Sequence, residues 1–203
     1  KISDENECAL VLKNNYDGSL PGYPFSFETL VTYSFQTANK LSCETVIQNT
    51  SESMMPMSFG WHPLFLQNVN INDIDLKINT IYKVATDDNQ IPDGKTSPFT
   101  NFSTMQKISD NEFDHCFKLE ENASGFSSII IRDTNQKITV EIKIEIGNKK
   151  FRYAQLYIPP HRNTIAIEPM TSWPDAFNNK QDLIQLLPNE MVSLNYSIEV
   201  TAY

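Results

Sequence analysis

The sequence contains few cysteines and few histidines. Cys8, Cys43 and Cys116 are widely spaced and odd in number, a pattern that excludes a disulfide framework and a CxxC metal site. Only three histidines are present, so no structural metal site such as zinc is expected. No apolar run approaches the roughly 20 residues that a membrane helix requires. The GxGxxG, Walker, GxSxG and HExxH motifs are all missing, so none of the protein classes that they mark is indicated.

Arginine is also scarce, and the chain is acidic. Arg132, Arg152 and Arg162 are the only arginines, and 16 Lys plus Arg against 25 Asp plus Glu give a net charge of −9. Affinity for nucleic acid comes from clustered cations, so this balance argues against a nucleic-acid binder and favours a neutral small molecule. We see no signal peptide, and a cytoplasmic location is the default expectation. We expect no strong macromolecular partner, and a monomer or homodimer.

The sequence is rich in strict alternation of apolar and polar residues. In "KITVEIKIEIG" (137–147) every second residue is Ile or Val. In "VSLNYSIEVTAY" (192–203) apolar residues likewise alternate with polar ones as far as Val200. Such alternation predicts antiparallel strands with one buried and one solvated face. The chain has 203 residues, of which 40% are hydrophobic and 20% charged, enough for one large core. We predict a single all-β domain over residues 1–203, a large and mostly antiparallel β-sandwich.

Further segments have the composition of strands, with turn signals between them. The expected strands are 25–36, 41–49, 74–85, 113–120, 127–133, 151–159 and 164–169. The expected turns are 14–24, 49–53, 87–98, 121–125, 133–136 and 146–150. The first 25 or so residues carry several turn signals and one short apolar run, "CALVL". The best helix candidate is about one turn within Trp173–Leu187.

The first candidate for chemistry is His62, in "SFGWHPLF" (58–65). An imidazole titrates near neutral pH and is therefore a natural proton donor or acceptor. Gly60 allows a close backbone approach and Pro63 stiffens the segment, while Trp61 offers a flat apolar surface of the kind that sugar rings contact. The alternative is a histidine packed in the core, and the residues alone leave both interpretations open.

The second candidate is Glu168, which follows the apolar run "TIAI" and precedes a proline. A carboxylate at the end of an apolar strand is partly desolvated, which raises its pKa and makes it a better base. In "FDHCF", Asp114 and His115 lie on opposite faces of a strand, and whichever faces a cavity can bind a ligand. Gln155 carries a donor and an acceptor and can orient a hydroxyl. For Glu168 and Asp114 the alternative is an ordinary surface carboxylate.

Taken together, these stretches resemble the aldose 1-epimerase (galactose mutarotase) family. The resemblance is carried by "MPMSFGWHPLF" (55–65), "FDHCFKL" (113–119), "AQLYIPP" (154–160), "AIEPMTSWPDAFN" (166–178) and "LLPNEMVSLNYSIEV" (186–200). Their order and approximate spacing agree with the family from Tyr23 onward. The resemblance implies a β-sandwich with an open sugar-binding cleft, and cofactor-free interconversion of the α and β anomers of a hexose.

The resemblance also implies a role for each candidate residue. Glu168 is the expected general base for the anomeric hydroxyl, and His62 the expected general acid for the ring oxygen. Asp114 would hold sugar hydroxyls, Gln155 would help to place the substrate, and Trp61 would contact it. Family members carry an earlier histidine, and often an arginine, that contact the sugar. This chain has neither before His62, so we expect the family's N-terminal part to be absent and the activity of the 203 residues to be open.

Three other functions compete with this interpretation. A hexose-6-phosphate epimerase of the same superfamily would need an Arg or Lys cluster for the phosphate. A non-catalytic carbohydrate-binding module would keep the sandwich and bind sugar without accelerating anomer exchange. A glycoside hydrolase would use two carboxylates, for which Asp114 and Glu168 are the available pair.

Overall fold

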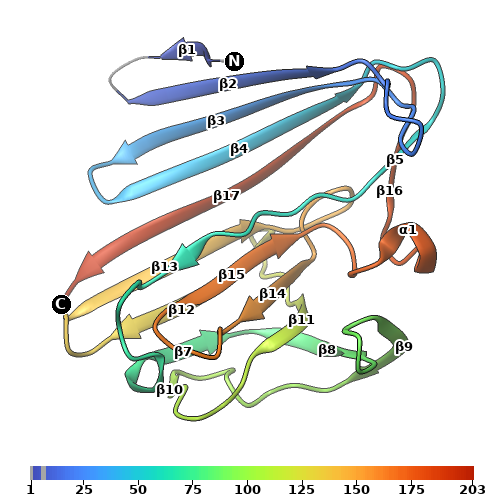
Figure 1. Ribbon diagram of the computed structural model, residues 1–203. Helices are drawn as coiled ribbons and strands as arrows, with labels where there is room; N and C mark the ends of the chain where they lie inside the picture. The colour runs from blue at the N-terminus through green and yellow to red at the C-terminus, as the bar shows by residue number, and fades with distance from the viewer. Residues whose placement is uncertain (1, 6–7) are drawn as a thin grey trace.

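Two antiparallel sheets make up most of the structure, a computed structural model that describes residues 2–5 and 8–203 (Figure 1). The larger sheet has nine strands in the order β1-β2-β3-β4-β17-β13-β12-β7-β10. Their bounds are β1 (Ile2–Glu5), β2 (Ala9–Tyr16), β3 (Phe27–Thr37), β4 (Lys40–Asn49), β17 (Met191–Ala202), β13 (Ile138–Glu145), β12 (Phe126–Asp133), β7 (Asp75–Ile78) and β10 (Gln106–Lys107).

The smaller sheet has six strands in the order β6-β15-β14-β11-β8-β9, and a two-stranded ribbon pairs β16 with β5. Their bounds are β6 (Leu64–Phe65), β15 (Ile165–Met170), β14 (Tyr153–Tyr157), β11 (Asp114–Leu119), β8 (Thr80–Thr86), β9 (Pro92–Ser97), β16 (Ile184–Leu186) and β5 (Met55–Met57). Every pairing of these strands is antiparallel. The predicted all-β, antiparallel sandwich is therefore confirmed.

The core lies between the two sheets and follows the alternation in the sequence. On β13, Val140, Ile142 and Ile144 are buried, whereas Glu141 and Lys143 are half-exposed on the other face. Inward-facing residues of β12 and β13 join those of β14 and β15 in one apolar cluster. Its fully buried members include Ile129, Ile131, Ile142, Ile144, Leu156, Ile165 and Ile167. This cluster fixes the positions of the strands that carry the candidate residues.

The structure contains the short strands β1, β5, β6, β10 and β16, which were not among the expected strands. It also departs from the longer strand and turn predictions in three places. The expected strand 74–85 is two strands, because β7 joins the large sheet and β8 joins the small one, with a break at Asn79. The expected turn 87–98 contains β9, which pairs with β8. The expected turn 14–24 begins too early, because β2 continues to Tyr16 and pairs there with Phe27. In each case, backbone pairing with a neighbouring strand determines where the strand lies, even though the local composition predicts otherwise.

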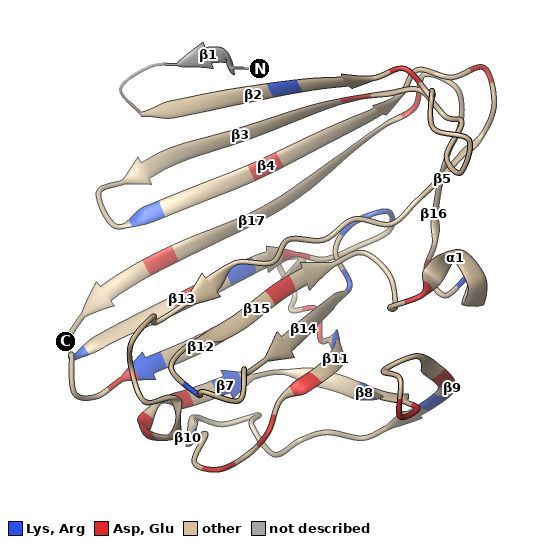
Figure 2. Cartoon of the chain, viewed as in Figure 1, with Lys and Arg blue, Asp and Glu red and all other residues tan. Residues whose placement is uncertain are grey.

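Helix is confined to short segments, as the sequence predicts. The helix α1 (Ala176–Asn179) lies within the predicted stretch, and a 3₁₀ turn covers Ile71–Asp73. In the described part of the chain, we find no helix with the length and apolar character needed to cross a membrane. Figure 2 shows Lys and Arg at separate positions along the strands and loops.

Candidate active site

Three neighbouring strands of the small sheet bring the predicted residues together. Gln155 on β14 pairs directly with Glu168 on β15. On its other side β14 pairs with β11, where Asp114 lies opposite Tyr157 and Cys116 opposite Gln155. In antiparallel sheets such paired residues share a face. The register therefore places Glu168, Gln155 and Cys116 in a row across β15, β14 and β11, and Asp114 on the same face two residues before Cys116.

His62 joins this row from the segment before β6. Its Nε2 lies 3.1 Å from Oε1 of Glu168, and the side chains are 63% and 14% exposed respectively. Gly60 forms an isolated bridge with Met170, and a Cβ added at Gly60 would lie 3.2 Å from the carbonyl oxygen of Pro169. The predicted close backbone approach at this glycine is thus observed. It holds the histidine against the end of β15, and the interpretation of His62 as a buried core residue is wrong.

A cavity of about 450 Å³ lies over the row, and we call it the Glu168 cavity. It is lined by His62, Thr86, Gln90, Asp114, Cys116, Gln155, Tyr157, Glu168, Met170 and Pro174. A volume of this size is typical of small-molecule sites. Asp114 is therefore the member of the Asp114–His115 pair that faces a cavity. His115 is half-buried beside the ring of Phe117, at a centroid distance of 6.2 Å.

Burial raises the pKa of the Glu168 carboxyl above its usual value. The positive charge that His62 can carry opposes this rise, and the nearby Asp114 adds to it. Desolvation disfavours the ionised form, so the carboxylate, once ionised, is a stronger base than an exposed one. Burial also raises the pKa of the Cys116 thiol, to about 12. A thiol that stays protonated at neutral pH is a poor nucleophile.

The Asp114 and Gln155 side chains hold each other in position. The Gln155 Nε2–H donates to Oδ1 of Asp114 at 2.8 Å. The other amide atom, Oε1 of Gln155, is buried and has no hydrogen-bond partner among the described residues. A buried acceptor without a donor costs free energy, so a hydroxyl that donated to it would be stabilised.

Trp61 lines a second hollow next to the first. This hollow, which we call the Trp61 hollow, measures about 410 Å³ and shares His62, Glu168, Met170 and Pro174 with the Glu168 cavity. The indole packs edge-on against Tyr33 and Phe59, at centroid distances of 6.0 and 5.8 Å. Its ring is therefore held within an aromatic cluster at the border of the site, and its role in substrate binding stays a prediction.

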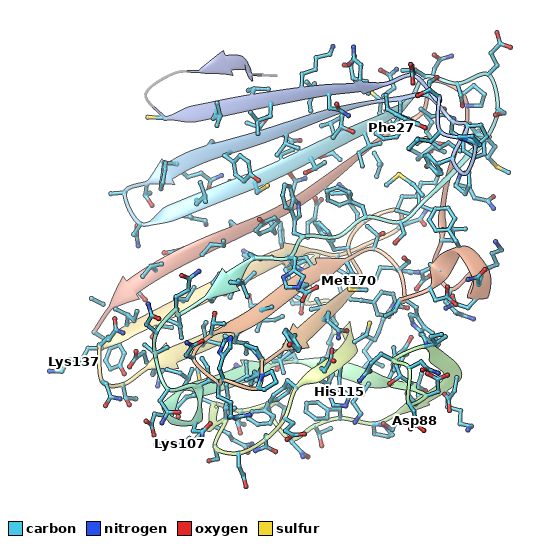
Figure 3. The ribbon with its side chains drawn as sticks, viewed as in Figure 1. Phe27, Asp88, Lys107, His115, Lys137 and Met170 are labelled. Atoms are coloured by element: carbon cyan, nitrogen blue, oxygen red, sulfur yellow. The ribbon has the colours of Figure 1, made fainter. Side chains whose placement is uncertain are left out.

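Several residues of the cavity were not predicted from the sequence. Thr86 and Gln90 come from the end of β8 and the following turn, and Met170 and Pro174 from the end of β15 and the loop after it. Figure 3 labels Met170, which lies near the middle of the side-chain view. Nothing in the local sequence of Thr86 and Gln90 marks a site. Only the pairing of β8 with β11 brings them beside Asp114. The other two histidines lie outside the cavity lining, and His161 is exposed, as expected.

The described residues offer no group of three or more His, Cys, Asp or Glu side chains arranged to hold a metal ion. What the arrangement offers instead is proton transfer. A carboxylate and an imidazole in contact, at the edge of a cavity with hydroxyl-binding groups, can act as a base and an acid on the same small molecule.

Comparison with known proteins identifies the fold and the family of the chain. The chain is 28% identical over 183 residues to YihR, an uncharacterized protein of Escherichia coli (strain K12). The matched region covers 81% of this chain and 53% of YihR. A galactose mutarotase-like protein from Clostridium acetobutylicum has a similar structure, with a TM-score of 0.82, 16% identity, and coverage of 100% of this chain and 65% of that one. The GalM/aldose epimerase homologue from C. elegans gives a TM-score of 0.84 at 13% identity, covering 100% and 68%.

A galactose 1-epimerase from Lactobacillus acidophilus NCFM also shares the fold, with a TM-score of 0.76, 19% identity, and coverage of 100% of this chain and 65% of that one. The chain thus spans about half the length of its curated relative and about two thirds of these solved structures. The family model described as aldose 1-epimerase matches residues 1–199. The chain therefore belongs to the aldose 1-epimerase family.

Proposed function

We propose that the protein is an aldose 1-epimerase that interconverts the α and β anomers of a free hexose. The observation that carries the proposal is the 3.1 Å contact between His62 and Glu168 at the edge of the Glu168 cavity. Family membership supports the reaction class. The Asp114–Gln155 pair supports a ligand with several hydroxyl groups, because carboxylate and amide atoms bind hydroxyls well.

In the proposed mechanism the two residues exchange roles between the halves of the reaction. Ionised Glu168 takes the proton of the anomeric hydroxyl, while His62, in its imidazolium form, donates a proton to the ring oxygen. The C1–O5 bond breaks and the C1–O1 bond becomes a carbonyl, so the ring opens to the aldehyde. Rotation about C1–C2 presents the other carbonyl face. Ring closure then returns both protons and gives the opposite anomer.

The surroundings of the two residues suit this cycle. Glu168 is buried enough to be a good base, and His62 is exposed enough to move when sugar oxygens replace its contact with Glu168. In this proposal Asp114 and Gln155 bind hydroxyls away from the anomeric carbon. Holding the ring in one orientation contributes to the rate, because the reacting atoms are then already aligned with the acid and the base.

The test is polarimetric relaxation of freshly dissolved α-D-glucose and α-D-galactose. We expect the protein to accelerate relaxation, and Glu168→Gln and His62→Gln each to lower the catalysed rate by a factor of about 10² to 10⁴. Exposed residues outside the cavity provide matched controls, and Glu112→Gln and His161→Gln should leave the rate unchanged. Relaxation at the uncatalysed rate with both sugars would reject the proposal. Sugar binding without acceleration would identify a binding module instead.

A further inference from the structure

The β8–β9 hairpin forms the end of the Glu168 cavity that lies farthest from the acid–base pair in the sheet. The strand order β15-β14-β11-β8 places Glu168, Gln155, Asp114 and Thr86 on four successive strands. Three strand spacings correspond to about 14 Å between the first and last backbones. A sugar bound to Glu168 and His62 at one edge therefore extends toward the hairpin with its other edge. Figure 3 labels Asp88, in the turn that connects β8 and β9.

Gln90 is the polar group that this turn directs to the cavity lining, where its exposed side chain makes one hydrogen bond and its backbone is held by the turn. The Thr86 hydroxyl donates to Oε1 of Gln90 at 3.0 Å. The backbone N–H of Gln90 donates to the Asp87 carbonyl at 3.0 Å, and the Asp87 carboxylate accepts from Ile91 N–H at 3.0 Å. Gln90 has a φ of 62°, in the left-handed region that such tight turns use. Its Nε2 donors have no partner among the described residues, so they are available to a ligand.

The charges around the cavity define the kind of ligand that suits it. Its lining includes the carboxyl groups of Asp114 and Glu168, two amides, and the hydroxyls of Thr86 and Tyr157. None of the lining residues in the described chain is a Lys or an Arg. An anionic substituent such as a phosphate would face two carboxyl groups with no Lys or Arg to pair with, and His62, which can carry a positive charge, already contacts Glu168. Binding such a group therefore costs free energy. An uncharged polyol can donate to Asp114 and to Oε1 of Gln155, and can accept from Gln90.

We propose that Gln90, held by Thr86, is a specificity-determining residue that hydrogen-bonds a hydroxyl of an uncharged sugar at the edge remote from Glu168. This inference rests on the proposed function, because it assigns a substrate class to the same site. It adds a residue that touches the substrate without taking part in proton transfer. Selection among hexose epimers then depends on whether a hydroxyl points toward the hairpin.

The test measures sugar affinity by calorimetric titration in a Glu168→Gln background, where catalysis is removed but the hairpin is intact. We expect Gln90→Ala to weaken binding of the preferred hexose about fivefold to tenfold, as for the loss of one hydrogen bond to a neutral partner. It should also reduce the preference between D-glucose and D-galactose. Asn89→Ala is the matched control, because Asn89 lies in the same turn but outside the cavity lining. In the otherwise native protein, Gln90→Ala should raise KM and leave kcat unchanged.

A charge substitution gives an independent result. Gln90→Arg introduces the missing cation and should raise affinity for glucose 6-phosphate relative to glucose at least tenfold. Unchanged affinity and unchanged epimer preference in Gln90→Ala would overturn the inference, as would tight phosphate-sugar binding by the native cavity. Failure of the proposed function is distinguishable: the native protein would then bind hexose without accelerating mutarotation, while the effect of Gln90→Ala on affinity would still decide the role of Gln90.

Discussion

The proposed catalytic role of Glu168 carries an energetic cost, because both the role and the cost depend on the burial of its carboxyl group. The desolvation that makes it a stronger base also disfavours its ionised form in the folded protein. Asp114 adds to this effect through its own negative charge, whereas His62 counters it. Two consequences can be measured, one in the pH dependence of the rate and one in the pH dependence of stability.

The pH–rate profile is the first consequence. A base acts in its ionised form, so activity falls as the pH drops through the pKa of Glu168. Because burial raises that pKa, the acid limb of kcat/KM should lie at a higher pH than an ordinary glutamate, about 4.3, would give. Asp114→Asn removes a negative charge that favours protonation, and should move the acid limb to lower pH besides reducing affinity. An acid limb that stays in place or moves upward in Asp114→Asn would show that Asp114 does not influence the base.

Stability is the second consequence, and its sign follows from linkage. A carboxyl whose pKa is raised in the folded state contributes stability fully below its unfolded pKa, and that contribution is lost as the pH rises through the folded pKa. At pH 7 the ionised carboxyl of Glu168 therefore lowers the free energy of unfolding of the native protein, and a neutral glutamine at this position does not. We expect Glu168→Gln to raise Tm at pH 7 by about 2–4 °C for each kcal/mol recovered, and the difference to shrink toward pH 4. An equal shift at both pH values, measured by calorimetry with Glu112→Gln as the exposed control, would contradict this account.

The residues of the site divide into those that sequence could predict and those that it could not. His62 and Glu168 stand out because each chemically active side chain lies within an apolar segment, and the structure places them in contact. Asp114 and Gln155 follow from strand alternation, which gives the face of each side chain but not the neighbouring strand. Thr86 and Gln90 lie in a polar turn of ordinary composition. Their place in the site depends on the strand order, which no local pattern encodes.

The strands also divide into those that the local sequence pattern predicts and those that depend on pairing with strands distant in the sequence. Strands with a clean two-residue period, such as β13 and β17, were predicted because one face is buried, along most of β13 and over the first half of β17. The break at Asn79 was missed, because β7 and β8 form a continuous strand-like sequence and separate only to join different sheets. The strand β9 was missed because "PDGKTS" has turn composition, and its pairing with β8 alone makes it a strand.

The loop after β15 is the element on which the shape of the site most depends. Residues Trp173 and Pro174 of this loop border the cavities, and its far end is fixed by Asp182. The Asp182 carboxylate accepts from the Tyr153 hydroxyl at 2.5 Å and from Lys118 Nζ at 3.3 Å, and it also pairs with the Arg152 guanidinium. Three donors from β11, β14 and the residue before β14 thus hold one acceptor in the loop.

We expect Asp182→Ala to destabilise the protein by about 1–3 kcal/mol, because it leaves partly buried donors without their acceptor. It should also raise KM for the sugar, since the loop that borders the cavity loses its anchor. Thermal unfolding and steady-state polarimetry measure the two effects. The control is Asp93→Ala, which breaks an exposed pair with Lys95 and should alter neither quantity. A lower Tm with an unchanged KM would show that the anchor serves the fold alone.

At the scale of the whole molecule, the core is unevenly distributed between the two ends of the large sheet. Strands β12 and β13 alternate between fully buried and half-buried residues, and β14 and β15 are mostly buried. By contrast, β2 and β3 have no fully buried residue. Figure 1 shows why: the small sheet faces the β13, β12 and β7 part of the large sheet, while β2 and β3 extend beyond it. The candidate site thus lies at the well-packed end.

This asymmetry predicts a gradient of local stability. Opening of a segment costs more when it exposes more buried apolar surface, and every 1.4 kcal/mol changes amide exchange about tenfold. In hydrogen–deuterium exchange, peptides from β2 and β3 should exchange at least tenfold faster than peptides from β12 to β15, although all of them are hydrogen-bonded strands. Sugar binding should slow exchange further in β14 and β15, where Gln155 and Glu168 lie, and leave β2 and β3 unchanged. Uniform protection across the nine-stranded sheet would mean that the sheet opens as one cooperative unit. The packing of the core would then not set the local stability of its strands.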